Sequence, residues 1–214
     1  VLVDEVKGIA NILSDNTTRR YYACNISTLN EIDKSAMVER HIVSPLLATK
    51  EQTTRLILSD DETISVMINE EDHVRIQAIV GGMNLEEAYE EASKVDDIAY
   101  EKLHFAFDDK FGYLTECPTN AGTGMRASCM LFLPALSSAR MIQKLIEEVG
   151  KFGMTIRGIY GEGSKSLGNM YQVSNQKTLG NSEIEIIENI KQIVTQVVSQ
   201  ERKRREYMLS VNSD

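Results

Sequence analysis

The fold is decided by residues 55–68, which read RLILSDDETISVMI. Two runs of mainly aliphatic residues, 55–59 and 63–68, flank a turn of three acidic residues, and this is the pattern of a β-hairpin. Alternate residues of a strand point to the same face, and in the second run these are Ile64, Val66 and Ile68. The stretch therefore predicts two antiparallel strands with one apolar face.

Further strands and helices are expected on both sides of this hairpin. The strand candidates are residues 21–26, 73–80, 113–116, 154–160 and 170–173. The helix candidates are residues 1–14, 28–41, 84–107, 134–150 and a last helix that starts at Ser182. The strands follow one another as hairpin neighbours, and the helices come in blocks. This order predicts an α+β fold with a mostly antiparallel β-sheet flanked by α-helices, built as a single domain over residues 1–214.

Local signals are expected to fix the helix ends. A Ser, Thr or Asn followed three residues later by Glu has the spacing of a capping box, and this spacing occurs at Thr28, Asn84 and Ser182. Glu201 begins the run ERKRRE near the end of the last helix. Cations near the carboxyl end of a helix interact favourably with its dipole, so this run is expected to be a solvated helix end.

Composition limits the functions open to the chain. With 214 residues, of which 42% are hydrophobic and 26% charged, it can bury a substantial core. The net charge of −9 argues against a broad nucleic-acid surface, and no apolar run approaches the roughly 18–20 residues of a membrane span. Three widely spaced cysteines favour a reducing compartment. We therefore expect a soluble, cytoplasmic protein without a metal site, a nucleic-acid partner or a membrane partner.

Residues 117–126, CPTNAGTGMR, form the second informative stretch. Pro118 fixes its own backbone and disfavours helix before it, while Gly122 and Gly124 permit positive φ and close approach of a ligand. Arg126 then opens an apolar run. A guanidinium beside exposed backbone amides suits a bound phosphate. The alternative is an ordinary turn with a surface arginine.

Three arginines stand near loops that carry glycine or acid: Arg75, Arg126 and Arg157. Together they would form a guanidinium clamp for a polyphosphate, because bidentate hydrogen bonds to its oxygens neutralise charge. Taken singly, each also fits a surface ion pair. Two acids, Glu71 at a turn and Glu162 between glycines, would suit a cationic acceptor beside that phosphate. The alternative for the turn at Glu71 is a run of solvated acids.

Two motifs together resemble a known family. Residues 69–73 read NEEDH and are followed by Arg75, and residues 117–126 have the form Cys-Pro-Thr-Asn-x-Gly-Thr-Gly-x-Arg. Both, in this order, resemble the ATP:guanidino phosphotransferases, the phosphagen kinase family. Residues 157–163, RGIYGEG, and 172–176, QVSNQ, look most like its bacterial protein-arginine kinase branch, which phosphorylates arginine side chains of proteins. The resemblance covers nearly the whole chain and implies a catalytic domain of the glutamine-synthetase and guanido-kinase type.

The resemblance implies a role for each site residue. It suggests Glu162 as the base and Glu71 as the group that holds the acceptor guanidinium, although a carboxylate pair can share these roles. It places Cys117 near the acceptor. ATP, bound with Mg²⁺, is expected at the residues that match the family's nucleotide clamp and phosphate loop: His41, Arg75, Arg126, Ala127, Ser128, Cys129, Met130 and Arg157.

The same resemblance implies partners and missing parts. It implies protein substrates with exposed arginine, a role in a stress response, and a heat-shock repressor, an activator protein and a Clp-type protease as partners. A phosphate arm, Ser-x-Arg-x-Arg, is expected before Val1, and a helical domain with homodimer contacts is expected after Asp214. Both ends are therefore expected to be truncated, and the polypeptide alone is expected to bind ATP weakly and to turn over poorly.

Two other functions fit the same residues. A phosphagen kinase would act on free arginine or another small guanidine. A catalytically idle domain would serve as a regulatory or adaptor module, since no phosphate arm precedes Arg19.

Overall fold

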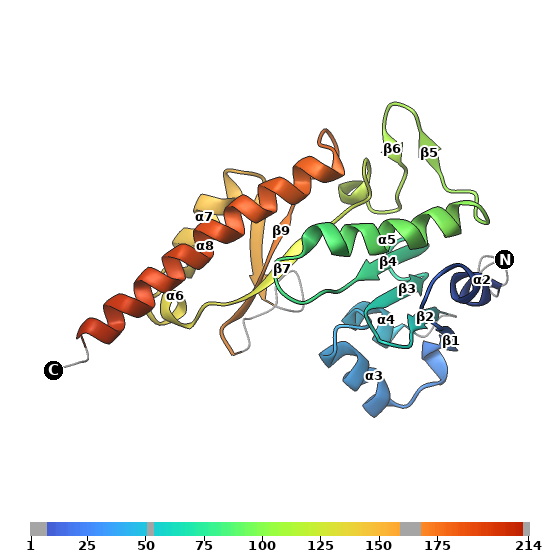
Figure 1. Cartoon of the computed structure of the whole chain (residues 1–214), viewed down its shortest axis with the longest axis horizontal. Helices are drawn as coiled ribbons and strands as arrows, with labels where there is room; N and C mark the ends of the chain where they lie inside the picture. Colours follow the sequence, from blue (N-terminus) through green and yellow to red (C-terminus); the bar gives the residue numbers. More distant parts are fainter. Residues whose placement is uncertain (1–7, 51–53, 159–167, 212–214) are drawn as a thin grey trace. The chain divides into compact units, whose positions relative to one another are not determined.

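A computed structural model describes residues 8–50, 54–158 and 168–211. The chain forms two compact units, each with its own antiparallel sheet and helices (Figure 1). Unit 1 comprises Val1–Phe107 and Thr115–Cys117, and unit 2 comprises Asp108–Leu114 and Pro118–Asp214. The α+β fold with antiparallel sheets is confirmed, while the single domain expected over residues 1–214 stays a prediction.

Unit 1 is built on a four-stranded antiparallel sheet in the order β1-β2-β3-β4. Its strands are β1 (Tyr21–Asn25), β2 (Arg55–Ser59), β3 (Ile64–Ile68) and β4 (Val74–Ala78). The expected hairpin is confirmed as β2 and β3, with Ile57 opposite Val66. The last three strands follow one another through short turns, which antiparallel neighbours allow.

Hydrophobic cores cover both faces of this sheet. One face packs against α2 (Ile9–Asn16) and α5 (Leu85–Tyr100), and its core contains Ile64, Val66 and Ile68, the alternating set expected to share a face. The other face packs against the segment that carries η2 (Ile26–Thr28), α3 (Glu31–Glu39) and α4 (Pro45–Thr49). Leu56 and Met67 are fully buried on that side. Because each such side chain contributes about 1.5–3 kcal/mol on burial, the two cores fix the register of β3.

Helix ends in unit 1 differ from the expectation. Asn30, not Thr28, caps α3, because its side chain accepts a hydrogen bond from an amide of the first turn at 2.9 Å. The side chain of Asn84 instead donates to a preceding carbonyl at 2.8 Å and leaves α5 without a side-chain cap. α5 also ends at Tyr100, before residue 107, and the turn that follows buries Leu103 in the core.

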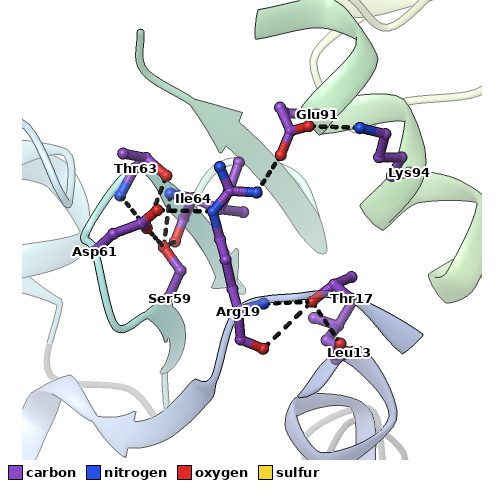
Figure 2. A network of polar contacts seen from close by, with 9 residues as sticks. All are labelled: Leu13, Thr17, Arg19, Ser59, Asp61, Thr63, Ile64, Glu91 and Lys94. Atoms are coloured by element: carbon purple, nitrogen blue, oxygen red, sulfur yellow. Dashed lines mark hydrogen bonds and ion pairs between the residues drawn. The ribbon is translucent and has the colours of Figure 1, made fainter. Parts of the chain in front are cut away.

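An arginine joins three separate segments of unit 1 (Figure 2). Arg19, just before β1, pairs with Asp61 at 2.7 Å and also with Glu91 of α5. Asp61 lies in the β2–β3 turn and accepts further hydrogen bonds from Ser59 and Thr63 at 2.6–3.1 Å. Partial burial alone would raise the pKa of Asp61, but the hydrogen bonds from Ser59, Arg19 and Thr63 outweigh it and hold that pKa well below its usual value.

Unit 2 is built on a three-stranded antiparallel sheet in the order β7-β9-β8. Its strands are β7 (Ser128–Phe132), β9 (Met170–Asn175) and β8 (Met154–Gly158). The helices α7 (Ile142–Gly150) and α8 (Glu183–Val211) pack on the sheet, α7 along β8 and α8 along β7 and β9. A separate pair of short strands, β5 (Phe107–Asp108) and β6 (Gly112–Tyr113), replaces the strand expected over 113–116.

The helix expected over residues 134–150 is two helices, α6 (Pro134–Ser138) and α7. They are separated at Arg140, whose φ of 58° does not fit an α-helix. The capping box at Ser182 is confirmed, because its hydroxyl accepts from the Glu185 amide while the Glu185 carboxylate accepts from the Ser182 amide. Within the described ranges, no helix combines the length and the apolarity that a membrane span requires.

The run expected to be a solvated helix end contains a buried carboxylate. Glu201 is only 3% exposed, and it accepts hydrogen bonds from the amides of Ala135 and Leu136 at 3.0 and 2.9 Å. Arg205, one turn later, donates to the same carboxylate at 2.6 Å. Glu201 therefore satisfies free amides at the start of α6, and the expectation of a solvated run is wrong at this residue.

Replacing Asp61 by Asn is expected to lower the free energy of unfolding by about 1 kcal/mol at pH 7, because Arg19 loses a charged partner. Since the pKa of Asp61 is lower in the folded state than in the unfolded state, its stabilising effect is complete above about pH 5 and is lost as the pH falls through the folded pKa. The stability difference should therefore shrink in acid. Urea unfolding between pH 7 and pH 2.5 measures this difference.

The matched control is Asp60→Asn, because Asp60 is the exposed neighbour in the same turn. This substitution should leave the acid dependence unchanged. A stability difference for Asp61→Asn that stays constant or grows in acid contradicts the prediction.

Candidate functional site

The β3–β4 turn, residues 69–72, presents one carboxylate to solvent. Asn69 begins the turn with a φ of 60°, and its amide bonds to the carbonyl of His73 at 3.0 Å. Glu70 is buried at 3% exposure, whereas Glu71 is exposed and Asp72 is half-buried. The alternative of a fully solvated acidic turn is therefore wrong for Glu70 and Asp72. Glu71, expected to hold the acceptor, is the acid of this turn that faces water.

Asp72 holds the segment of Cys117 beside this turn. Its Oδ1 accepts hydrogen bonds from the amides of Glu116 and Cys117 at 2.7 and 3.4 Å. Thr115 also donates its hydroxyl to the Cys117 carbonyl at 2.6 Å. The Cys117 residue is half-buried. The structure thus brings together the backbones of Glu71 and Cys117, the two residues expected on the acceptor side.

Arg75 and His41 lie near the polar side of β4. Arg75 is 46% exposed, and its Nη1 pairs with Glu70 Oε1 at 3.1 Å. Gln77 lies two residues further along the strand, on the same face, and donates to the main-chain oxygen of His41 at 2.6 Å. His41 has a φ of 59°. Unit 1 therefore carries four of the expected site residues: Glu71 and Arg75 lie on the turn and on β4, and His41 and Cys117 lie on segments that bond to them.

In unit 2, a buried side chain fixes the backbone on both sides of Arg126. Asn175 is 1% exposed, and its Oδ1 accepts from the Ala127 amide at 2.9 Å. Its Nδ2 donates to the carbonyls of Met125 and Lys177 at 3.1 and 2.9 Å. Arg126 itself is exposed. The main chain on either side of the guanidinium is thus held in place while the charged group faces water.

The glycine loop before Arg126 is tightly packed. Gly122 has a φ of 106°, and a Cβ at that position would lie 2.4 Å from the carbonyl oxygen of Thr178. Thr178 is buried, and its hydroxyl donates to the carbonyls of Thr119 and Ala121 at 2.9 and 2.6 Å. Gly124 also has a positive φ, of 63°. Both glycines adopt the positive φ that this residue type permits, and no larger residue fits at Gly122.

The remaining expected nucleotide residues lie on the unit 2 sheet. Met130, Gln172 and Arg157 stand opposite one another across β7, β9 and β8. Ser128 shares their face, because side chains alternate along a strand, and its hydroxyl accepts from Gln172 Nε2 at 2.8 Å. Cys129 points to the opposite face, where burial raises the pKa of its thiol. Any contact of Cys129 with a ligand on the Arg157 face would therefore come from its main chain.

Glu162, the expected base, lies outside the described residues. The described residues also contain no group of three or more His, Cys, Asp or Glu side chains placed to hold a metal ion. Sequence reasoning missed the anchoring side chains Glu70, Asp72, Asn175 and Thr178. The only signal for Asn175 was its place in the QVSNQ segment, and nothing local distinguished Glu70 from Glu71.

Comparison with known proteins assigns the chain to a family. A family model described as ATP:guanido phosphotransferase, C-terminal catalytic domain, matches residues 3–204. The protein-arginine kinase of Clostridium kluyveri is 50% identical over 194 residues, which are 91% of this chain and 56% of that protein. That of Caldanaerobacter subterraneus is 48% identical over 197 residues, which are 91% of this chain and 58% of that protein. The chain thus spans between half and three-fifths of the length of these relatives.

Solved structures agree with this assignment. A duplicated taurocyamine kinase from Schistosoma mansoni, solved with transition state analog components, matches with a TM-score of 0.76 and 27% identity over 94% of this chain and 30% of that chain. A lombricine kinase matches with a TM-score of 0.75 and 20% identity over 93% of this chain and 58% of that chain, and it supports the fold alone. The family model covers most of the chain, so the resemblance read from the two motifs is confirmed. The chain belongs to the ATP:guanido phosphotransferase family and carries its catalytic domain.

Proposed function

We propose that the protein transfers the γ-phosphoryl group of ATP to the guanidinium of arginine residues in other proteins and yields phosphoarginine and ADP. The observation that carries the proposal is the turn at residues 69–72, in which an exposed Glu71 stands between two anchored acids. The names of the relatives supply the acceptor class, since proteins 48–50% identical to this chain are protein-arginine kinases.

The proposed chemistry needs a carboxylate because the acceptor is a cation. An arginine guanidinium has a pKa above about 12, so its nitrogen must lose a proton before it attacks phosphorus. Glu71 would orient the guanidinium by paired hydrogen bonds, and Glu162 would take the proton. The new N–P bond forms as the bond between the γ-phosphorus and the bridging oxygen breaks, and the electron pair leaves with ADP.

The arginines would bind the nucleotide. Arg75, Arg126 and Arg157 carry the positive charge that a triphosphate requires. Mg²⁺ would be bound through the ATP phosphates, and it would neutralise phosphate charge. The acceptors would be proteins with exposed arginine side chains, and the reaction would take place in the cytoplasm.

A second candidate is a kinase for a small guanidine such as free arginine. The observation in its favour is the TM-score of 0.76 with a taurocyamine kinase. The two candidates share the bond chemistry and differ in the acceptor.

Replacing Glu71 by Gln is expected to lower phosphoryl transfer at least about 100-fold, because a neutral amide no longer orients the cationic guanidinium. ATP affinity should stay within about twofold. Mass spectrometry of phosphoarginine, with the natural full-length protein, ATP and a protein acceptor, measures transfer, and calorimetry measures ATP binding. The control is Glu87→Gln, an exposed acid on α5. Unchanged transfer by Glu71→Gln contradicts the role of Glu71.

Acceptor choice is decided in the same assay with a protein and free arginine present together. The proposed function expects phosphoarginine within the protein acceptor. Phosphorylation of free arginine alone contradicts it and supports the second candidate. No transfer to either acceptor, with a regulatory effect that survives in Glu71→Gln, supports an adaptor role.

Replacing Asn175 by Ala is expected to weaken ATP binding about tenfold and to lower the free energy of unfolding by about 1–3 kcal/mol. The substitution frees the backbone on both sides of Arg126 and leaves a buried amide and carbonyls without partners. Calorimetry with ATP and urea unfolding measure the two effects. The exposed neighbour Gln176 provides the control, Gln176→Ala. Unchanged ATP affinity in folded Asn175→Ala refutes the link between Asn175 and Arg126.

A further inference from the structure

The proposed chemistry leaves one buried carboxylate of the turn without a role. Glu70 precedes Glu71 and is 3% exposed. Its Oε1 accepts from Arg75 Nη1 at 3.1 Å and from the Ser44 hydroxyl. Its Oε2 accepts from the backbone amide of Glu71 at 2.7 Å. One carboxylate thus contacts Arg75, a residue of the proposed nucleotide clamp, and the main chain of Glu71, the residue proposed to hold the acceptor.

All three groups around Glu70 are donors. Ser44 caps α4 by accepting from the Leu47 amide at 3.0 Å, so its own proton is available to Glu70. Arg75 and the Glu71 amide have no acceptor to offer. A buried charge is costly unless it is paired and hydrogen-bonded. Both oxygens of the Glu70 carboxylate therefore accept hydrogen bonds from these groups.

A lysine fixes the main chain of the same turn. Lys50, at the end of α4, donates from Nζ to the carbonyl oxygens of Asn69, at 3.0 Å, and Glu70. Both ends of the α4 segment therefore hold the start of the turn: Ser44 binds the Glu70 side chain, and Lys50 binds the carbonyls of Asn69 and Glu70. Little freedom is left for the residue that follows, Glu71.

Arg75 keeps donors for a ligand while it is held by Glu70. A guanidinium has five N–H donors in a planar fork, and Glu70 contacts its Nη1. The side chain is 46% exposed. The ion pair thus sets the direction of the fork and leaves its outer edge to face a phosphate.

We propose that Glu70 is a positioning residue that orients Arg75 towards ATP and Glu71 towards the acceptor guanidinium at the same time. This inference rests on the proposed function for the reaction, but the two contacts of Glu70 stand without it. A purely structural role would affect folding alone. The proposed role affects ATP affinity through Arg75 and turnover through Glu71.

The test is Glu70→Gln in the natural full-length protein. The amide has nearly the same shape, but one oxygen becomes an NH₂ group that faces a donor. We expect kcat to fall about 10–100-fold and both the Kd and the KM for ATP to rise about tenfold. In a nitrogen-15 NMR spectrum, the amide signal of Glu71 should move upfield as its hydrogen bond to Glu70 weakens.

The matched control is Glu201→Gln. Glu201 is also 3% exposed, accepts from backbone amides and pairs with an arginine, Arg205, but it belongs to neither proposed binding group. The Glu201→Gln variant should lose stability as Glu70→Gln does. Its kcat, its ATP affinity and its Glu71 amide signal should stay unchanged. Equal changes in the two variants, measured where both are folded, would overturn the proposal.

A double substitution isolates the link to Arg75. In an Arg75→Ala background, Glu70→Gln should cause no further loss of ATP affinity, because the group it orients is gone. Additive losses overturn the link. If the unchanged protein transfers phosphate to no guanidinium, the proposed function fails, while ATP affinity and the Glu71 amide signal still decide whether Glu70 positions these two groups.

Discussion

The burial of β3 on both faces is the constraint on which unit 1 depends. All five residues of this strand are buried, with Ile64, Val66 and Ile68 in one core and Met67 in the other. A one-residue slip would exchange the two sets of side chains, so the register is fixed. The starting point of the turn that follows is thereby fixed, with Glu70 directed to the α4 side and Glu71 to solvent. The position of Glu71 is therefore a consequence of core packing.

Exposed charged groups in both units are held by buried polar side chains. Glu70 anchors the turn of Glu71 in unit 1, and Asn175 anchors the loop of Arg126 in unit 2. A flexible loop would lose conformational entropy whenever a ligand ordered it. An anchored loop has already lost this entropy on folding, at the expense of stability. Buried groups without direct ligand contact can thus determine how well exposed ones bind.

Local patterns in the sequence predicted what depends on local geometry. Alternation gave the β2–β3 hairpin, and the Ser182 capping box was correct. The same local signal failed at Thr28 and Asn84, neither of which caps its helix. The errors in burial depend on distant partners: Glu201 is buried because it caps a helix 65 residues earlier in the chain, and Glu70 is buried because it meets Ser44. No periodicity separates a solvated acid from a buried one when the partner lies in another segment.

The side chains of the three consecutive acids of the turn point in different directions, so they do not compete for the same partners. Glu70 turns inwards to Arg75, and Asp72 turns sideways to the backbone of Glu116 and Cys117. Their charges are met by donors, so neither is left to bind a cation. Glu71 remains as the exposed charge of the turn. A motif of adjacent acids can thus supply one ligand-facing carboxylate together with the two anchors that fix its backbone, which a single acid in a flexible loop does not provide.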